Sequence, residues 1–403
     1  MAYIDRRPSI IMLTHVHINK PPIDLYLHTS PIEIACSKTT MTSPQMPKTM
    51  QAWRKSFPSS SPFLKEIPVP MPKEDEVLVK LLAMGVCHSD CTLLEMPESM
   101  YGMKDEYTLG HEACGEIVAL GSFETDYATG DKVAIHIIPG CNATTCPDCS
   151  RGLNRICRKE GGGNYGLGIS DGFFAEYVVV KHRAVAKIPD GLGVEEAAVS
   201  ADAVLTAYHA VRYTGAPDAN DTIVILGLGG VGMNGLQTAL YLGVPANKIL
   251  VMDKRQVSLD GAVNLGIPKE HIFLAGDDGT TSLQQYVTEK GIHVDIVFDF
   301  AGHEQTMTTA QMVVRNGGTI VLVGLMSPKV PLIPIVAVVK ALTVKTAYNG
   351  TMDAFRECLE LMSKGVLKPR VETGSIMSLP SVLKDLNDGK IQNRMVLLPN
   401  WRG

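Results

Sequence analysis

The sequence has no long apolar run and no excess of positive charge, and these two absences exclude two classes of protein. Its longest uncharged stretch, residues 222–247, contains several glycines together with Asn234, Gln237 and Thr238. A membrane span needs about 20 consecutive apolar residues, so this stretch is typical of a buried strand, a turn and a helix. The net charge of −5 argues against a general nucleic-acid-binding protein, which usually carries net positive charge. We therefore expect neither a membrane nor a nucleic acid as partner.

A secretory signal is lacking as well. The apolar run Ser9–Thr14, which follows Arg6 and Arg7, is too short for a signal peptide, so we expect a cytoplasmic protein. The chain contains nine cysteines, four of them within residues 141–157. In a reducing compartment, clustered cysteines bind metal more often than they form disulfides.

The composition is that of a globular protein with two or three domains, because 403 residues carry 45% hydrophobic and 20% charged side chains. Residues 1–46 are the exception, since prolines interrupt them and their apolar residues follow no sustained period. We predict that they form a disordered N-terminal extension or result from a gene start placed too early. A targeting role is the alternative. Asp5, Asp24 and Glu33 argue against a mitochondrial presequence, which is poor in acidic residues.

Two patterns divide the rest of the chain. Residues 47–203 show short strands such as Glu76–Ala83 separated by turns, which predicts a β-rich domain. From 204 to 345, strands such as Thr222–Leu226 alternate with helices such as Met233–Leu242, which indicates an α/β domain with a doubly wound parallel sheet. Residues 346–403 contain two predicted helices and a final strand, Arg394–Leu398.

A glycine motif follows the strand Thr222–Leu226 and opens a helix. It has the form G-x-G-x-x-G and consists of Gly227, Leu228, Gly229, Gly230, Val231 and Gly232. In this context the glycines permit a tight turn and close approach of the backbone to a pyrophosphate, which the helix N-terminus attracts. The next strand ends at Asp253, where an acidic side chain binds the ribose hydroxyls. A strand-to-helix turn without a ligand is the alternative.

Asp253 also bears on the choice of cofactor. A 2′-phosphate beside its carboxylate would bring like charges together, which favours NAD over NADP. Lys254 and Arg255 follow directly and partly offset that repulsion.

Potential metal ligands lie in the β-rich part and at its end. Cys87 is followed by His88, Ser89 and Asp90, and a second group consists of His111 and Glu112. A third potential ligand, Asp202, lies at the junction with the dinucleotide-binding part. A catalytic zinc ion needs three protein ligands and one open position, and acidic neighbours such as Asp90 and Glu112 suit the orientation of a ligating His111.

The cysteine cluster has the spacing Cys141-x4-Cys146-x2-Cys149-x7-Cys157. Four thiolates on one loop enclose a tetrahedral zinc ion with no open position, so the cluster predicts a structural zinc site. The flanking basic residues suggest an alternative, a zinc module that grips phosphate, but the acidic chain argues against it.

Together these motifs resemble those of the zinc-dependent alcohol dehydrogenases of the medium-chain dehydrogenase/reductase family. The resemblance extends from about Met46 to Arg402 and includes Gly-Val-Cys-His-Ser-Asp at 85–90, Leu-Gly-His-Glu at 109–112 and the glycine motif. It implies a GroES-like catalytic domain at 47–203 and 346–403, interrupted by a Rossmann NAD-binding domain at 204–345. It also implies a homodimer or homotetramer.

The resemblance further implies roles for individual residues. The third zinc ligand, counted from Glu195 and Glu196, falls on Asp202, as in some members, although an N-cap of the following helix is the alternative. The sequence departs from the family pattern at two places. The spacing between the first two loop cysteines is longer than usual, and Thr92 stands where some members have the histidine of a proton relay. Ile137 stands where many members have a bulky aromatic residue in the substrate pocket. The implied cofactor contacts are His88, Thr206, Gly302, Val323, Gly324 and Arg394.

We therefore expect reversible oxidation of a primary or secondary alcohol to an aldehyde or ketone. In this scheme Cys87, His111 and Asp202 hold zinc, Ser89 passes on the alcohol proton, and a hydride is transferred to NAD. The alternatives are a zinc-free quinone or enone reductase of the same family and a non-catalytic NAD-binding protein. The small-molecule substrate itself is not predicted.

Overall fold

The structure is a computed structural model that describes residues 46–99, 102–159, 161–276 and 281–401. Pro47–Gly403 forms one compact unit. The disordered extension predicted for residues 1–46 lies outside the described residues, apart from Met46. Within the described ranges, no helix combines the length and the apolar character that crossing a membrane requires.

A mixed sheet forms the framework of the β-rich part. Its strand order is β15-β16-β3-β5-β6-β8, with β7 also paired to β3. The central strand β3 (Glu76–Val86) is almost entirely buried and pairs antiparallel with β5 (Glu112–Leu120) and β16 (Arg394–Leu398). The remaining strands are β6 (Lys132–Ile135), β7 (Tyr177–Lys181), β8 (Val185–Lys187) and β15 (Val371–Ser375). A smaller sheet of order β2-β1-β4 consists of β1 (Thr49–Ser56), β2 (Phe63–Pro68) and β4 (Glu106–Thr108).

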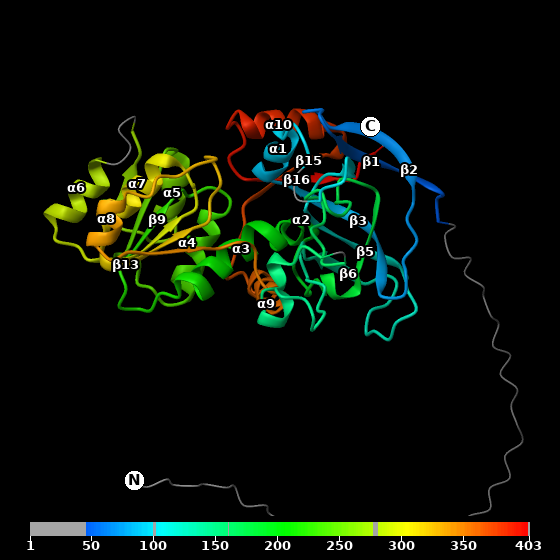
Figure 1. Cartoon of the computed structure of the whole chain (residues 1–403), viewed down its shortest axis with the longest axis horizontal. Helices are drawn as coiled ribbons and strands as arrows, with labels where there is room; N and C mark the ends of the chain where they lie inside the picture. The colour runs from blue at the N-terminus through cyan, green and yellow to red at the C-terminus, as the bar shows by residue number, and fades with distance from the viewer. Residues whose placement is uncertain (1–45, 100–101, 160, 277–280, 402–403) are drawn as a thin grey trace, which may run out of the picture. The chain divides into compact units, whose positions relative to one another are not determined.

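A parallel sheet of order β11-β10-β9-β12-β13-β14 follows in the chain. In two of its inner strands, the largely apolar β9 (Ile223–Leu226) and β10 (Ile249–Asp253), every residue is buried, because helices cover both faces. Figure 1 shows these helices around the sheet. The other strands are β11 (Ile272–Leu274), β12 (Val294–Asp299), β13 (Val314–Leu322) and β14 (Thr343–Thr346).

Two apolar clusters fix these helices to the sheet. On one face α4 (Gly232–Tyr241) and α5 (Gln256–Asn264) bury Leu236 and Leu259. On the other face α6 (Thr281–Glu289) and α7 (Glu304–Val313) bury Leu283 and Met307. Three further helices follow later in the chain: α8 (Pro334–Val339), α9 (Met352–Ser363) and α10 (Leu379–Asn387).

A continuous helical segment, residues 194–215, leads from the mixed sheet to the parallel sheet. It contains α2 (Val194–Ala198), a π-helical turn (Ser200–Val204), α3 (Leu205–His209) and a second π-helical turn (Ala210–Gly215). Asp202 lies inside the first π-helical turn, and its side chain makes no N-cap hydrogen bond there. The N-cap role considered for Asp202 is therefore wrong.

The predicted fold class is confirmed, whereas one detail of the β-rich part is not. Sequence patterns indicated only strands and turns there, but the structure has the helix α1 (His88–Glu95) directly after β3. The Asp90 carboxylate accepts a hydrogen bond from the backbone N–H of Cys87 over 2.9 Å, and this contact stabilises the first turn. The short helix has only weak apolar periodicity, so the pattern did not reveal it.

Candidate dinucleotide and metal sites

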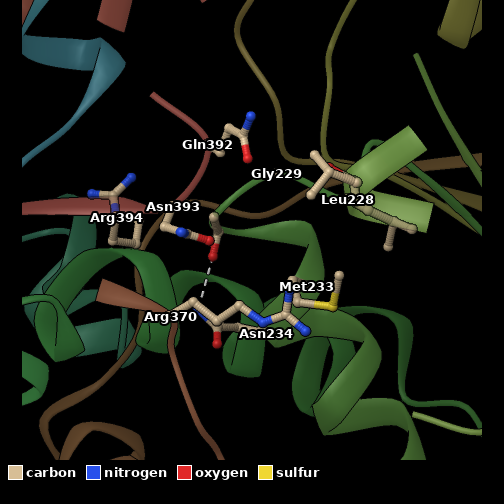
Figure 2. Close-up of a pocket in the computed structure, with 11 residues that line it drawn as sticks. Leu228, Gly229, Met233, Asn234, Arg370, Gln392, Asn393 and Arg394 are labelled. Carbon is tan, nitrogen blue, oxygen red and sulfur yellow. Dashed lines mark hydrogen bonds between the residues drawn. The ribbon is translucent and has the colours of Figure 1, made fainter. Parts of the chain in front are cut away.

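The glycine motif, through Leu228, Gly229 and Gly230, lines a pocket whose other walls are the starts of α4 and α5 and residues 392–394 (Figure 2). Gly227 has a φ of 86°, a conformation that favours glycine. A Cβ atom at Gly232 would lie 1.8 Å from the Gly227 carbonyl oxygen, so the turn requires glycine there. A Cβ atom at Gly229 would meet only the Arg255 guanidinium, at 3.5 Å. The backbone at Gly229 is therefore open to a ligand, as a pyrophosphate cradle requires.

Asp253 lies at the end of β10, where the sequence predicted a ribose contact. Its carboxylate accepts hydrogen bonds from the backbone N–H groups of Leu228 (2.6 Å) and Arg255 (2.8 Å). The Arg255 guanidinium lies 3.4 Å from the same carboxylate. Asp253 thus holds the glycine turn against β10, and a carboxylate has room for further hydrogen bonds from a ligand.

Positive charge gathers around this pocket. Arg370 and Arg394 line it, and the pKa of His88 is lowered by burial and by the neighbouring charges of Arg394, Arg255 and Lys254. These cations suit the two negative charges of a pyrophosphate. The sequence predicted His88 and Arg394 but not Arg370, which no motif marks.

The predicted nicotinamide-side residues lie at the carboxyl ends of β12 and β13. A Cβ atom at Gly302 would lie 1.9 Å from the Gly324 carbonyl oxygen, so the two loops meet without room for side chains. The buried Asp299 carboxylate accepts a hydrogen bond from the Gly302 N–H over 2.8 Å, while Val323 donates its N–H to the Asp299 carbonyl over 2.9 Å. Asp299 therefore orders this edge, a role that the sequence did not reveal.

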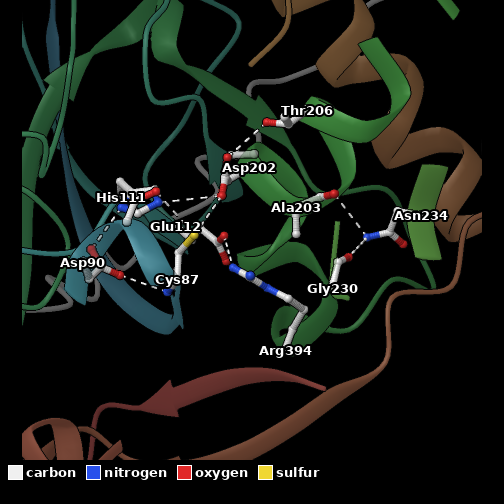
Figure 3. A network of polar contacts seen from close by, with 12 residues as sticks. Cys87, Asp90, His111, Glu112, Asp202, Ala203, Thr206, Gly230, Asn234 and Arg394 are labelled. Atoms are coloured by element: carbon white, nitrogen blue, oxygen red, sulfur yellow. Dashed lines mark hydrogen bonds and ion pairs between the residues drawn. The ribbon is translucent and has the colours of Figure 1, made fainter. Parts of the chain in front are cut away.

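Four potential metal ligands converge where α1, β5 and the π-helical turn meet (Figure 3). They are Cys87, His111, Glu112 and Asp202, whose donor atoms all lie within 4.8 Å of one another. The Asp202 Oδ2 atom lies 3.4 Å from the Cys87 Sγ atom and 3.7 Å from the His111 Nε2 atom.

These separations can be compared with those around a metal ion. With zinc–ligand distances of about 2.3 Å for sulfur and about 2.1 Å for nitrogen and oxygen, a tetrahedral centre separates its ligands by about 3.4–3.6 Å. Cys87, His111 and Asp202 therefore fit three corners of a zinc tetrahedron. One soft thiolate, one imidazole and one carboxylate form a ligand set typical of zinc.

Asp90 fixes the orientation of His111. Its Oδ1 atom lies 3.0 Å from the His111 Nδ1 atom, which leaves Nε2 directed at the ligand group. Burial favours neutral His111, but the charge of Asp90 and hydrogen bonds to Asp202, Asp90 and Cys87 raise its pKa. Burial likewise disfavours the Asp202 carboxylate, yet the hydrogen bond and charge of His111 hold its pKa below the ordinary value.

Glu112 is fully buried and belongs to the same group, since one carboxylate oxygen lies within 4.8 Å of the donor atoms of Cys87, His111 and Asp202. Its ion-pair partner is Arg394, which the sequence did not reveal, and its influence on the orientation of His111 stays a prediction. Burial raises the pKa of Glu112 to about 8, although the Arg394 charge opposes this effect. Arg394 therefore contacts both Glu112 and the dinucleotide pocket, and it joins the two sites.

The other residues predicted near the metal group take separate positions. The Ser89 Oγ atom lies 3.7 Å from the Cys87 Sγ atom. Thr92 donates its hydroxyl to the His88 carbonyl (3.2 Å) within its own helix. Thr206 donates its hydroxyl to Asp202 Oδ1 over 3.0 Å, and Ile137 is buried. Ser89, unlike Thr92, is therefore close to the ligand group.

The four loop cysteines also converge. The sulfur atoms of Cys141 and Cys149 lie 3.7 Å apart, and those of Cys146 and Cys157 lie 3.9 Å apart. Four thiolates around a tetrahedral zinc ion would lie about 3.8 Å from one another. The residues between Cys141 and Cys146 form a turn that begins with Asn142 at a positive φ of 54°. The longer spacing is thus absorbed by a turn, and the cluster fits zinc.

A second pocket is lined by Ile156, Arg158, Asn164 and Tyr348. Tyr348 is 45% exposed, and partial burial of its hydroxyl raises its pKa. The next residue, Asn349, donates its side-chain amide to the Ala201 carbonyl over 2.9 Å, beside Asp202. No sequence motif marked Tyr348.

Comparisons with known proteins show the family of the chain. The family described as "Alcohol dehydrogenase GroES-like domain" matches residues 73–190, and that described as "Zinc-binding dehydrogenase" matches residues 230–364. An alcohol dehydrogenase of Geobacillus stearothermophilus is 30% identical over 342 residues, which cover 83% of this chain and 94% of that protein. An NDMA-dependent alcohol dehydrogenase of Amycolatopsis methanolica is 28% identical over 82% of this chain and 94% of its own length.

Solved structures agree with the sequence relatives. The structure of acetophenone reductase from Geotrichum candidum in complex with NAD has a TM-score of 0.78 and 31% sequence identity. It covers 89% of this chain and 100% of its own. The chain therefore belongs to the zinc-type alcohol dehydrogenases of the medium-chain dehydrogenase/reductase family, and it is a nicotinamide-linked oxidoreductase that acts on alcohols.

Proposed function

We propose that Cys87, His111 and Asp202 hold a catalytic zinc ion, and that the enzyme uses it to oxidise an alcohol reversibly with NAD. The observation that carries this proposal is that Asp202 Oδ2 lies 3.4 Å from Cys87 Sγ and 3.7 Å from His111 Nε2, with all three donor atoms within 4.8 Å of one another, which suits a tetrahedral centre. When bound, zinc supplies Lewis-acid chemistry for the alcohol oxygen, and the nicotinamide accepts the hydride.

The residues of the chain bind, orient and move the proton. Asp90 holds His111 so that its Nε2 atom faces the ligand group. The Ser89 hydroxyl, near Cys87, accepts the alcohol proton and passes it to water or to the cofactor ribose. Thr206 donates to Asp202 and so restrains the carboxylate. Arg394 contacts Glu112 and also lines the glycine-motif pocket, where its charge would attract a pyrophosphate.

For the dinucleotide we propose NAD rather than NADP. Asp253 contributes a carboxylate where the adenosine ribose lies, and like charges disfavour a 2′-phosphate beside it. Gly227, Gly229, Gly230, Val231 and Gly232 would receive the pyrophosphate. Thr206 would lie against the nicotinamide, and Gly302, Val323 and Gly324 would contribute backbone on the cofactor side. Binding of NADPH as tightly as NADH, measured by fluorescence, would overturn this preference.

A second, structural zinc ion is proposed for Cys141, Cys146, Cys149 and Cys157. Sulfur separations of 3.7 and 3.9 Å support it, since they match those of a four-thiolate site. Metal analysis of the purified protein tests the proposal, which predicts two zinc ions per chain.

The domain division and the compartment also stay proposals. We assign 47–203 and 346–403 to the catalytic domain and 204–345 to the cofactor domain, since β15 and β16 lie in the mixed sheet. The cytoplasm is the expected compartment because zinc-binding thiols must stay reduced, and cell fractionation tests it.

A homodimer or homotetramer is supported by one exposed apolar surface. Helix α8 is wholly apolar (Pro-Ile-Val-Ala-Val-Val), yet none of its residues is buried, and Ile335 and Val338 are 71% and 77% exposed. Strand β14, at the edge of the parallel sheet, lies after it in the chain. Large apolar patches and open strand edges mark protein interfaces, so we propose that a second copy covers this surface. Val338→Glu should then yield monomers in sedimentation.

The assay of NADH formation tests the function itself. A panel of primary, secondary, aromatic and polyol alcohols is offered with NAD to protein of known zinc content. Turnover that persists after complete metal removal would favour a zinc-free reductase instead. NADH binding without turnover of any alcohol would favour a non-catalytic role.

A further inference from the structure

A buried amide connects the dinucleotide site with the segment that carries a metal ligand. Asn234 lies in the first turn of α4 and is 1% exposed. Its Nδ2 atom donates to the Gly230 carbonyl over 2.8 Å and to the Ala203 carbonyl over 3.2 Å (Figure 3). One carbonyl belongs to the glycine motif, and the other directly follows Asp202. Both hydrogens of one amide therefore bridge the two sites.

A second amide extends this connection. The Gln237 Oε1 atom accepts a hydrogen bond from the Lys368 backbone N–H over 2.8 Å, and its Nε2 atom lies 3.3 Å from the Lys368 carbonyl and 3.5 Å from Asn234 Oδ1. Two residues further on, the Arg370 carbonyl accepts a hydrogen bond from the Arg394 N–H over 2.9 Å. The amides of α4 thus bond the Asp202 turn directly, and they reach Arg394 only indirectly, through the segment from Lys368 to Arg370.

Burial of the Asn234 side chain destabilises the fold unless its amide forms hydrogen bonds. Burying an amide costs free energy unless hydrogen bonds compensate, and an apolar side chain would fill the same space in this buried helix face. The Asp202 turn is π-helical, a form that occurs frequently at functional sites and packs less regularly than an α-helix. The hydrogen bond that Asn234 donates to the Ala203 carbonyl therefore stabilises a turn whose own backbone hydrogen bonds are irregular.

We propose that Asn234 is a positioning residue that couples cofactor binding at the glycine motif to retention of the metal by Asp202. A dinucleotide on Gly229 and Gly230 orders the glycine turn, and Asn234 transmits that order to the carbonyl beside Asp202. This inference rests on the proposed zinc ligands and extends them. Because coupling is reciprocal, a bound dinucleotide should slow the loss of zinc from this site.

Asn234→Ser separates the two hydrogen bonds. A serine hydroxyl in a helix bonds the carbonyl four residues earlier, which is Gly230 here, but it is too short to reach Ala203 as well. Gln311→Ser is the matched control. Gln311 is a fully buried amide of α7 that also bonds the carbonyl four residues earlier, Met307 (3.0 Å), and a distant one, Pro331 (2.9 Å).

The experiment follows zinc release from the holoenzyme into a chromogenic chelator, with and without saturating NADH. The kinetic phase that belongs to the site is the one that Cys87→Ser lacks. NADH should slow this phase about fivefold or more in the parent protein and in Gln311→Ser, in line with ordinary coupling between sites. In Asn234→Ser the slowing should fall below about twofold, although NADH fluorescence still reports binding.

The possible outcomes are distinct. Equal slowing by NADH in Asn234→Ser and in the parent would overturn the inference, because NADH would then merely shield the metal. Absence of any phase that Cys87→Ser removes would overturn the proposed zinc site instead. Should Asn234→Ser fail to fold, Asn234→Thr retains the same local hydrogen bond with a larger side chain and provides the same comparison.

Discussion

The Nδ1 atom of His111 lies 3.0 Å from the Oδ1 atom of Asp90, and both side chains are almost fully buried. The same Asp90 carboxylate accepts the Cys87 N–H at the start of α1. One side chain thereby orients two of the three proposed zinc ligands. This arrangement explains why the helix that the sequence did not reveal matters for the site.

Asp90→Asn should weaken zinc binding without removing a ligand. An amide places a neutral partner opposite His111 and reduces the basicity of its imidazole. Loss of such a partner typically costs about 10- to 100-fold in metal affinity or activity. Competition with a chelator of known affinity measures the change. Affinity equal to that of the parent protein would mean that Asp90 only caps α1.

The cysteine loop should contribute to stability rather than to chemistry. Cys149→Ser should release one zinc ion and lower the unfolding temperature, because structural zinc sites contribute folding free energy. Turnover per folded chain should stay within about twofold of the parent value, as the loop zinc has no open position. Scanning calorimetry with metal analysis provides the test. An unchanged zinc content would refute the structural site.

Stability should fall between neutral and mildly acidic pH because of His136. This side chain is fully buried, donates its Nε2 hydrogen to the Gly350 carbonyl over 3.0 Å, and accepts the Ile138 N–H at Nδ1. Burial lowers its pKa to about 4. The imidazole of His136 is therefore protonated below about pH 6.5 in the unfolded chain, but only below about pH 4 in the folded chain.

Because the pKa of His136 is lower in the folded chain than in the unfolded chain, the free energy of unfolding decreases as the pH falls. The contribution of His136 is fully present above pH 6.5 and is lost as the pH falls toward 4, by about 2 kcal/mol at pH 5. Urea unfolding at both ends of this range should show a smaller loss for His136→Gln than for the parent protein. Parallel pH profiles for the two proteins would contradict the argument.

Tyr348 should influence the choice of substrate. It lines the second pocket, and the next residue, Asn349, is hydrogen-bonded to the Ala201 carbonyl beside Asp202. Tyr348→Ala should change the ratio of kcat/KM between bulky and small alcohols by about tenfold or more, since pocket contacts of this size are worth 1–3 kcal/mol. NADH affinity should not change. Identical substrate ratios in both proteins would place the substrate elsewhere.

Motifs with fixed spacing predicted most of the candidate site. Cys87 and His111 converge because strand β3 and the residue before β5 meet in one sheet, and the glycine motif lies where the strand and helix pattern indicated. The fold class followed from the change of period near Asp202. These features are local or belong to a resemblance that covers most of the chain.

Long-range pairings were beyond the sequence. Arg394 joins Glu112 across 282 residues, and Asn349 joins Ala201 across 148 residues. Nothing local distinguishes such polar residues from surface ones, because their partners are decided by tertiary packing. For the same reason the sequence placed Glu112 near His111 but did not reveal its ion pair with Arg394.

The most direct test compares zinc content and alcohol-dependent NADH formation in the parent protein and in Cys87→Ser. We predict that Cys87→Ser lacks one zinc ion and loses turnover on every alcohol, yet still binds NADH within about tenfold of the parent affinity. Full turnover by Cys87→Ser, or by protein stripped of zinc, would contradict the assignment of Cys87, His111 and Asp202 as the catalytic zinc site.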